Sequence, residues 1–409
     1  MAVDPEPDPA DHPPSRQWWD LGAVLLAWLV SRALLVAVGL REFVFYPDGP
    51  LAFDDLDVYS RWLPSLTAGT LPADDMWQYP PLSAFFFLLG SIGPDSVVSL
   101  LVAIVVVDLV LTVVLAWHRL AAGWYWVLFG LMIGPVLVSR FDVVPTLFAV
   151  LAVLSAAHPV RLGIWAAIGA GMKVWPVLVL PVVARRGAFR AGAAFVLTSL
   201  TLLGVTSLFF ADLTGFLGGQ GSRGLQVESV GALPFLIANA WVGGVDMEYR
   251  YGSMEVAAAG AGVVATVVTV VALIGFGWII VSWLRGRLER LPAPDVAFTI
   301  VLFSVVVSRV FSPQYSIWLL GLGTLCLVTP GSRVRVPVWL VAAAALLTQI
   351  LYPSGYGWLL AGDPGLVAIQ VVRICLVVVA LVWCWYRVML ASQDQPSSTT
   401  GPTTKVPLR

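Results

Sequence analysis

The chain has 409 residues, of which 59% are hydrophobic and only 11% are charged. Soluble domains carry about 25% charged residues, so this chain has too few to cover a surface exposed to water. Its formal net charge of −1 lacks the basic excess on which nucleic-acid binding depends. Composition therefore predicts an integral membrane protein whose partners include the lipid bilayer and no nucleic acid.

The common motifs of soluble enzymes are absent from the sequence. The three cysteines lie in apolar runs and the three histidines are scattered, so neither a disulfide framework nor a zinc site is predicted. No phosphate-binding P-loop, dinucleotide fingerprint or Ser-His-Asp order is present. This argues against a nucleotide-sugar donor in a Rossmann-like cytoplasmic domain. No cofactor is expected to be required, and nothing in the sequence supports a divalent metal.

Both ends of the chain are polar. Residues 1–19 are rich in Pro and Asp and lack the basic start and cleavage site of a signal peptide. They are predicted to form a disordered cytoplasmic tail, and residues 391–409 have the same character. The membrane domain is therefore assigned to residues 20–390.

Apolar runs follow one another from residue 21 to residue 388. A helix needs about 20 apolar residues to cross a bilayer. We predict an all-α fold with about twelve transmembrane helices, several of them short or interrupted by proline. The predicted spans are 21–40, 80–93, 96–117, 121–139, 142–157, 162–184, 192–211, 256–284, 294–310, 314–330, 337–352 and 365–388.

The distribution of arginine predicts the orientation of these spans. With both termini in the cytoplasm, nine arginines fall on the cytoplasmic side, and His118 and Arg119 fall outside, against the rule. Two long polar loops, 41–79 and 212–255, then become the first and fourth extracytoplasmic loops. The nine arginines are Arg185, Arg186, Arg190, Arg285, Arg287, Arg290, Arg333, Arg335 and Arg387.

The first long loop contains an acidic cluster, Asp54, Asp55 and Asp57. Such a cluster suits a solvated turn, and it equally suits a general base that takes a proton from a sugar hydroxyl. Tyr59 and Tyr79 in the same loop are typical of an interfacial aromatic belt. They also suit stacking against sugar rings.

The second long loop supplies a cation and polar partners. Arg223 can bind a phosphate in bidentate fashion, and Gln226 and Glu228 follow closely. An ordinary exposed loop is the alternative. Farther along, Arg309, Gln314 and Tyr315 flank the Ser-Pro break in SRVFSPQYSIWLL, which either exposes polar groups on the same side or is a simple proline kink.

Charged residues also occur inside the apolar runs. Intramembrane charges cost about 2.5–3.5 kcal/mol on insertion scales, so they usually face a cavity or one another. We expect Lys173 to be functional. Arg140 and Asp142 either form a local structural pair or contribute to function. Structural or snorkelling roles are predicted for Arg32, Asp108 and Arg373.

The order of these segments resembles the GT-C superfamily of membrane glycosyltransferases, and more narrowly glycosyltransferase family 87, the polyprenyl-phosphate-mannose-dependent mannosyltransferases of actinobacteria. The resemblance covers most of residues 20–390. It lies in DDLDVYSRW, YPPL, RFDVVPTLFAVLAVL, GIWAAIGAGMKVWPVLVLP, SRGLQVES and FSPQYSIWLL.

The resemblance implies an inverting hexosyltransferase that takes a sugar from a polyprenyl phosphate at the outer face of the plasma membrane. The catalytic base of the family lies in a D-x-x-V-Y setting, which assigns the role to Asp55, with Asp54 and Asp57 as close rivals. The sequence departs from related mannosyltransferases at Ser312-Pro313, which no histidine follows. Mannose is the expected sugar, and a cell-envelope glycolipid or polysaccharide is the expected acceptor.

Two other classes share the predicted topology. A secondary transporter or lipid carrier would also have broken helices and intramembrane charges. Such a transporter is expected to show an internal repeat, and the sequence contains none. A non-catalytic assembly partner would leave the clustered aspartates Asp54, Asp55 and Asp57 unexplained. The sequence therefore favours the transferase.

Overall fold

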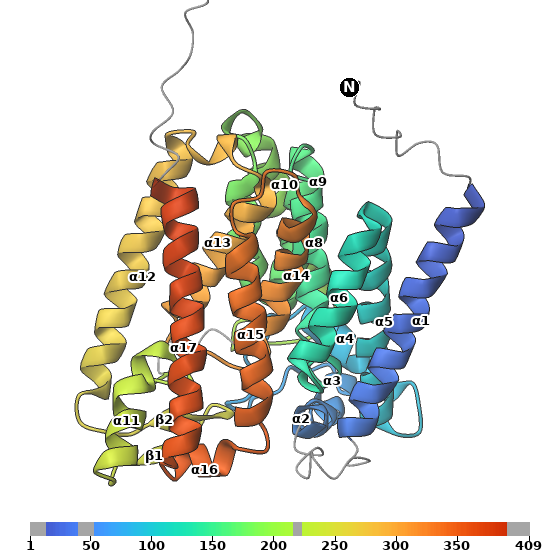
Figure 1. Ribbon diagram of the computed structural model, residues 1–409. Coiled ribbons are helices and arrows are strands. Elements are labelled where there is room, and N and C mark those ends of the chain that lie inside the picture. The colour runs from blue at the N-terminus through green and yellow to red at the C-terminus, as the bar shows by residue number, and fades with distance from the viewer. Residues whose placement is uncertain (1–13, 40–52, 216–222, 391–409) are drawn as a thin grey trace, which may run out of the picture.

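The computed structural model describes residues 14–39, 53–215 and 223–390. Residues 1–13 and 391–409 of the predicted tails, 41–52 of the first long loop and 216–222 of the second lie outside the described residues. Residues 14–19, which were predicted to belong to the disordered tail, instead begin helix α1. The described chain is mostly helical, as predicted, and its long helices stand side by side. In Figure 1, α1 begins and α17 ends at the same end of this bundle, and short elements close the opposite end.

Five helices are long and apolar enough to cross a membrane, by their length and composition. Their outward surfaces carry many exposed aliphatic side chains, such as Leu197 (65% exposed) and Leu273 (68% exposed). Apolar patches of that extent are rare on soluble proteins and suit contact with lipid. The five are α1 (Pro14–Gly39), α5 (Ser96–His118), α10 (Ala188–Ser207), α12 (Ala261–Leu284) and α17 (Pro364–Cys384), which continues into a π-helical turn, Trp385–Leu390.

Shorter apolar helices fill the spaces between the long ones. Within the described ranges they are shorter than the ~20 residues of a full crossing, so twelve spans remain a prediction. They are α6 (Leu120–Ile133), α8 (Val143–Leu154), α9 (Pro159–Met172), α11 (Leu233–Trp241), α13 (Ala293–Val306), α14 (Tyr315–Val328) and α15 (Arg335–Leu351).

Three predicted spans are interrupted in the structure. Span 121–139 is divided at Gly134 into α6 and the short α7 (Val136–Ser139). Span 80–93 is a five-residue helix, α4 (Ser83–Phe87), followed by a 3-10 turn at Leu88–Ser91. Span 162–184 is α9 followed by an extended Lys173 and a 3-10 segment, Trp175–Val182. Pro176 and Pro181 lack the backbone N–H of an α-helical hydrogen bond, and this loss explains the change of helix type.

The remaining elements are short. An antiparallel hairpin is formed by β1 (Met247–Arg250) and β2 (Ser253–Val256), with Glu248 opposite Glu255. The predicted all-α fold did not include this hairpin. The turn is formed by Tyr251 and Gly252, both with positive φ. The short helices are α2 (Asp54–Arg61), α3 (Leu63–Thr67), α7 (Val136–Ser139) and α16 (Tyr356–Leu360), and 3-10 turns cover Arg185–Gly187, Val230–Ala232 and Leu288–Arg290.

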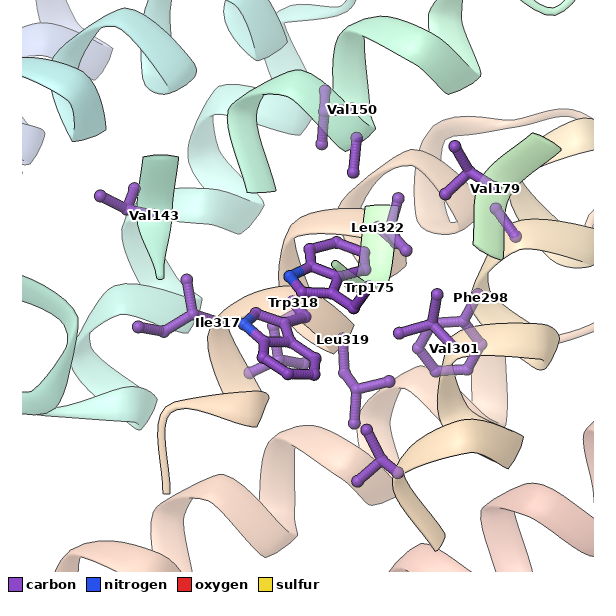
Figure 2. Packing of buried hydrophobic residues seen from close by; sticks show 14 of the residues in the cluster. Val143, Val150, Trp175, Val179, Phe298, Val301, Ile317, Trp318, Leu319 and Leu322 are labelled. Carbon is purple, nitrogen blue, oxygen red and sulfur yellow. The ribbon is translucent and has the colours of Figure 1, made fainter. Parts of the chain in front are cut away.

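The core of the bundle lies around α14, a helix in which nearly every side chain is buried. Figure 2 shows Trp318 of α14 beside Trp175, and the two rings stack with centroids 5.0 Å apart. Phe298 of α13 and Val150 of α8 pack in the same cluster. This packing anchors the broken segment after Lys173 against α14.

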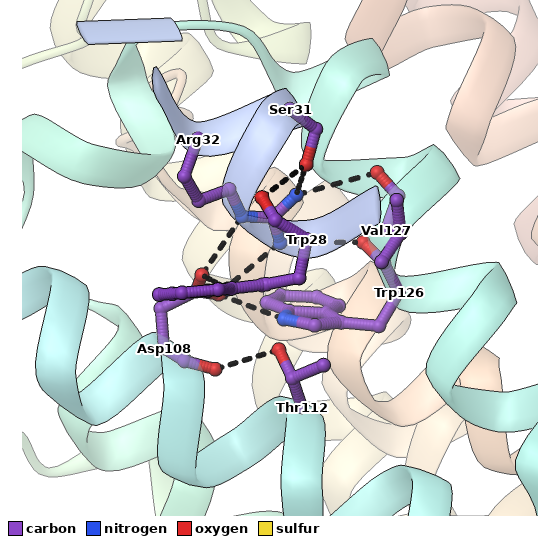
Figure 3. Close-up of polar contacts among 7 residues, drawn as sticks. All are labelled: Trp28, Ser31, Arg32, Asp108, Thr112, Trp126 and Val127. Atoms are coloured by element: carbon purple, nitrogen blue, oxygen red, sulfur yellow. Dashed lines mark hydrogen bonds and ion pairs between the residues drawn. The ribbon is translucent and has the colours of Figure 1, made fainter. Parts of the chain in front are cut away.

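A buried ion pair joins α1 to α5 (Figure 3). Asp108 Oδ2 accepts hydrogen bonds from Arg32 Nε at 2.8 Å and from Trp28 Nε1 at 2.6 Å. Its other oxygen accepts one from Trp126 Nε1 of α6 at 2.8 Å. The carboxylate is thus enclosed by donors from two other helices, which agrees with the structural role predicted for Arg32 and Asp108.

Loops predicted on the same side of the membrane contact each other. At one end of the bundle, Arg185 Nε lies 3.0 Å from Glu289 Oε1, and Asp295 accepts a hydrogen bond from the backbone N–H of Arg333 at 2.7 Å. At the other end, Gln78 Nε2 donates to the carbonyl of Tyr251 at 3.0 Å. The basic loops therefore contact one another, and so do the two long polar loops. The junction between spans 121–139 and 142–157, which the predicted topology places in the cytoplasm, differs: its Arg140 pairs with Asp55 of the first long loop. Which end faces the cytoplasm stays a prediction.

Candidate functional site

Two adjoining cavities lie at the end of the bundle that holds α2 and the hairpin. The first has a volume of about 340 Å³ and the second about 470 Å³. Asp55 and Arg140 contribute to the walls of both, as do Ser312 and Gln314. The shared residues make these cavities one continuous candidate site.

Helix α2 presents the acidic cluster to this site. Leu56 and Tyr59 are buried on one side of the helix and fix its rotation. Asp54, Asp55 and Asp57 occupy the first turn, where the partial positive charge of a helix N-terminus favours carboxylates. All three line the first cavity, but only Asp55 reaches the second. Partial desolvation, together with the charge of the neighbouring Asp57, raises the pKa of Asp54 above its ordinary value.

Arg140 follows α7 and pairs with the carboxylate of Asp55. Its Nη2 also donates a hydrogen bond to the hydroxyl of Tyr352 at 2.8 Å. The local pair of Arg140 with Asp142 that the sequence allowed is not formed, because each charge meets an opposite charge from another segment. Arg140 therefore belongs to the site.

Asp142 instead holds Lys173. Lys173 Nζ donates to Asp142 Oδ1 at 2.7 Å, and Trp318 Nε1 donates to the same oxygen at 2.6 Å. Asp142 is fully buried, whereas Lys173 lines the second cavity. Its ammonium lies 5.5 Å from the ring centroid of Tyr79 and 5.2 Å from that of Trp318, within the range of cation–π attraction.

Arg223 supplies a third cation to the second cavity. Its Nη2 donates to the carbonyl of Tyr251 at 2.7 Å, which ties the guanidinium to the hairpin turn. Burial lowers the pKa of Arg223, although an arginine stays charged in proteins. The side chain is thus held in place with its charge retained.

Arg309 was predicted to bind the donor but lines neither cavity. Its Nη1 donates to the carbonyl of Arg223 at 3.1 Å, and its Nη2 donates to Thr269 Oγ1 at 2.8 Å. Because the guanidinium is engaged with backbone and hydroxyl oxygens, Arg309 supports the segment that carries Arg223. This differs from the direct contact that the sequence suggested.

Gln226 and Glu228 lie in the wall of the first cavity. Gln226 Oε1 accepts the backbone N–H of Phe311 at 2.8 Å, and Gln226 Nε2 donates to Glu228 Oε2 at 3.0 Å. Glu228 is only 2% exposed, and Arg373 Nη1 lies 4.0 Å from its Oε1. Burial raises the pKa of Glu228 to about 7. The structural role predicted for Arg373 agrees with this buried network.

Aromatic side chains form the floor of the second cavity. The hydroxyls of Tyr59 and Tyr79 are 3.2 Å apart, and the ring of Tyr315 stacks on Trp318 with centroids 4.0 Å apart. Tyr59, Tyr79 and Tyr315 all line the cavity. Tyr59 is buried, so an exposed interfacial belt, one alternative from the sequence, is wrong for that residue.

Several polar atoms around the second cavity are buried and have no hydrogen-bond partner within the described part of the chain. They belong to residues that line the cavity: Arg140 (Nε), Arg223 (Nε), Gln314 (Oε1) and Trp175 (Nε1). Buried polar groups nearly always have a partner. Donors and an acceptor gathered in this way suit a polar ligand that completes their hydrogen bonds.

The sequence pointed to most of the charged residues of the cavities but missed other lining residues. Tyr352 and Trp318 line the cavities but were not predicted as site residues. Each lies in an apolar run, which predicts only a transmembrane helix. Arg140 and Asp142 were noticed as charges at membrane depth, but their partners were not foreseen. Within the described ranges, no group of three or more His, Cys, Asp or Glu side chains is arranged to hold a metal ion.

Comparison with known proteins adds no relative to this description. No protein-family model matches the chain, and no curated protein and no solved structure matches it. The described residues define a mostly helical protein with five helices suited to crossing a membrane and a polar, aromatic-lined site at one end.

Proposed function

We propose that this protein is an inverting glycosyltransferase of the plasma membrane. It moves a hexose, with mannose as the expected sugar, from a polyprenyl-phosphate donor to a cell-envelope acceptor at the outer face. One observation carries the proposal: the half-buried carboxylate of Asp55 stands where two cavities meet, and three cations line the second cavity. A carboxylate near a cation-lined pocket is what transfer from a sugar phosphate requires.

In the proposed reaction, Asp55 accepts the proton of an acceptor hydroxyl. The hydroxyl oxygen attacks the anomeric carbon, and the bond from that carbon to the phosphate oxygen breaks as the new glycosidic bond forms. The transition state has oxocarbenium character. A single displacement inverts the anomeric centre, and the electron pair of the broken bond leaves with the lipid phosphate.

The cations of the second cavity stabilise the leaving phosphate in this proposal. Arg223 and Arg140 have guanidinium groups suited to two parallel hydrogen bonds with phosphate oxygens, and Lys173 adds a point charge. Charges held in place before the reaction stabilise the product phosphate without reorganisation. No metal is required for this step.

The ion pair between Arg140 and Asp55 has a second consequence for the mechanism. A phosphate that binds Arg140 competes with Asp55 for the same guanidinium. The donor thereby loosens the hold of Arg140 on the carboxylate that must accept the proton. Donor binding and activation of the base are coupled through Arg140 in this account.

Sugar transfer by the purified protein tests the proposal. The donor is radiolabelled polyprenyl-phosphate mannose, and the acceptor is a lipid extract from the host. Asp55→Asn should reduce transfer by about 100-fold or more. Asp75→Asn is the matched control, since it makes the same change in the same loop at an exposed residue that lines neither cavity.

The outcomes separate the alternatives. Labelled product from wild type and from Asp75→Asn, but not from Asp55→Asn, supports both the reaction and the base. Near-normal turnover by Asp55→Asn would show that Asp55 is not the general base. A wild-type protein that does not bind the donor would exclude the transferase and favour the transporter.

A further inference from the structure

The two cavities differ in the charges that line them. The first is lined by four carboxylates and two cations, and the second by one carboxylate and three cations. The carboxylates of the first cavity are Asp54, Asp55, Asp57 and Glu228, and its cations are Arg61 and Arg140. The second cavity combines Asp55 with Arg140, Lys173 and Arg223. An anion is therefore favoured in the second cavity and disfavoured in the first.

Glu228 is the distinctive residue of the first cavity. It is almost fully buried, and its Oε2 accepts a hydrogen bond from Gln226. Its Oε1 has no hydrogen-bond partner among the described residues, and its nearest cation, Arg373, lies 4.0 Å away. A buried carboxylate oxygen in a cavity wall is suited to accept a hydrogen bond from a hydroxyl in that cavity.

Other lining groups suit a sugar. Gln314 contributes a buried amide oxygen without a partner in the described chain, and Tyr356 contributes an aromatic ring. The volume of about 340 Å³ lies at the small end of ligand pockets, which span about 300–1,000 Å³. The first cavity is therefore large enough for a small polyhydroxylated group.

We infer that the first cavity binds the acceptor, and that the acceptor presents hydroxyls and carries no negative charge beside the reacting sugar. The inference rests on the proposed transferase function, which gives the second cavity to the donor phosphate. Glu228 and Asp54 select the acceptor, because a phosphate or carboxylate placed against them would be repelled. Asp55 lies between the two bound substrates, where a base must stand.

Matched glycosides test this selection. The probes are octyl α-mannoside and the same glycoside with a phosphate at its 6-position. Each is measured as acceptor for radiolabelled polyprenyl-phosphate mannose and, separately, for equilibrium binding. The protein is held in lipid nanodiscs, because glycoside detergents would compete for the cavity. The pH is 8, above the pKa of about 7 to which burial raises Glu228.

Wild type should prefer the neutral glycoside by about tenfold or more, in binding and in kcat/KM. Glu228→Gln and Asp54→Asn should each narrow that preference several-fold. Asp54 is exposed, so its variant tests the inference even if Glu228→Gln fails to fold. Glu248→Gln is the control, since this exposed carboxylate of β1 lines neither cavity.

Each result separates this inference from the proposed function. Equal transfer to the neutral and the phosphorylated glycoside would overturn the acceptor assignment and leave the transferase function intact. So would a preference for the neutral glycoside that neither Glu228→Gln nor Asp54→Asn changes. Selective binding without any transfer would refute the transferase while the neutral polyol site stands. Failure of wild type to bind either glycoside would also overturn the inference.

Discussion

Arg140, which directly follows α7, and Asp55 of α2, the helix within the first long loop, form an ion pair. The same guanidinium donates to the hydroxyl of Tyr352, 212 residues farther along the chain. Three distant segments therefore meet at one side chain, and that side chain lies in the walls of both cavities.

Arg140→Gln should lower transfer by about 100-fold, because it removes a phosphate-binding cation and the partner of the proposed base. Most of the loss should appear in kcat, since the charge acts on the leaving phosphate. Steady-state kinetics with labelled donor measure it. Arg250→Gln, which removes an exposed arginine of the hairpin, should behave as wild type. A normal kcat for Arg140→Gln would exclude this role.

Asp108→Ala should destabilise the protein by about 3–5 kcal/mol, because it leaves the buried Arg32 without its counter-charge. Thermal unfolding in detergent measures the effect. The double variant Arg32→Met with Asp108→Leu should recover only part of the loss, since no buried charge remains but the indole N–H groups of Trp28 and Trp126 lose their acceptor. An unfolding temperature of Asp108→Ala equal to that of wild type would show that the pair is dispensable.

Glu228 should make stability depend on pH. Its folded pKa of about 7 lies above the ordinary 4.5, so the folded state holds more protons than the unfolded state between these values. The free energy of unfolding contributed by Glu228 is therefore largest below pH 4.5 and falls by about 3 kcal/mol as pH rises to about 7.

Chemical unfolding across that pH range checks the sign. Glu228→Gln removes the titration, so its advantage over wild type should grow as pH rises. Glu248→Gln should keep the wild-type slope, because that carboxylate is exposed. A difference between wild type and Glu228→Gln that does not change with pH would mean that the environments of Arg373 and Arg140 keep Glu228 ionised throughout.

Cysteine labelling tests the orientation. In a background with Cys326, Cys375 and Cys384 replaced by alanine, Asp57→Cys should react with a membrane-impermeant maleimide added to intact cells. Arg287→Cys should react only after the cells are opened, because its basic loop is predicted to be cytoplasmic. The reverse pattern would invert the topology and place the site on the cytoplasmic side.

Local sequence predicted the parts of this protein that depend on local properties. Apolar runs predicted the long helices, because hydrophobicity is a property of a few neighbouring residues. Helix α2 was not predicted, because its acidic residues were interpreted as part of a polar loop. The prediction of a membrane span at 80–93 was wrong. The segment is apolar, but Phe86 and Phe87 are buried within the protein, and local sequence does not show this burial.

The sequence by itself determined that this chain is helical, apolar on its outer surface and acidic in its first polar loop. Only the tertiary structure decided which charges meet: Asp142 binds Lys173 rather than Arg140, and Arg309 supports Arg223 from outside the cavities. The physical reason is that a buried charge requires an opposite charge or a hydrogen-bond partner wherever the fold provides one. That partner is chosen by how the helices pack and not by distance along the chain.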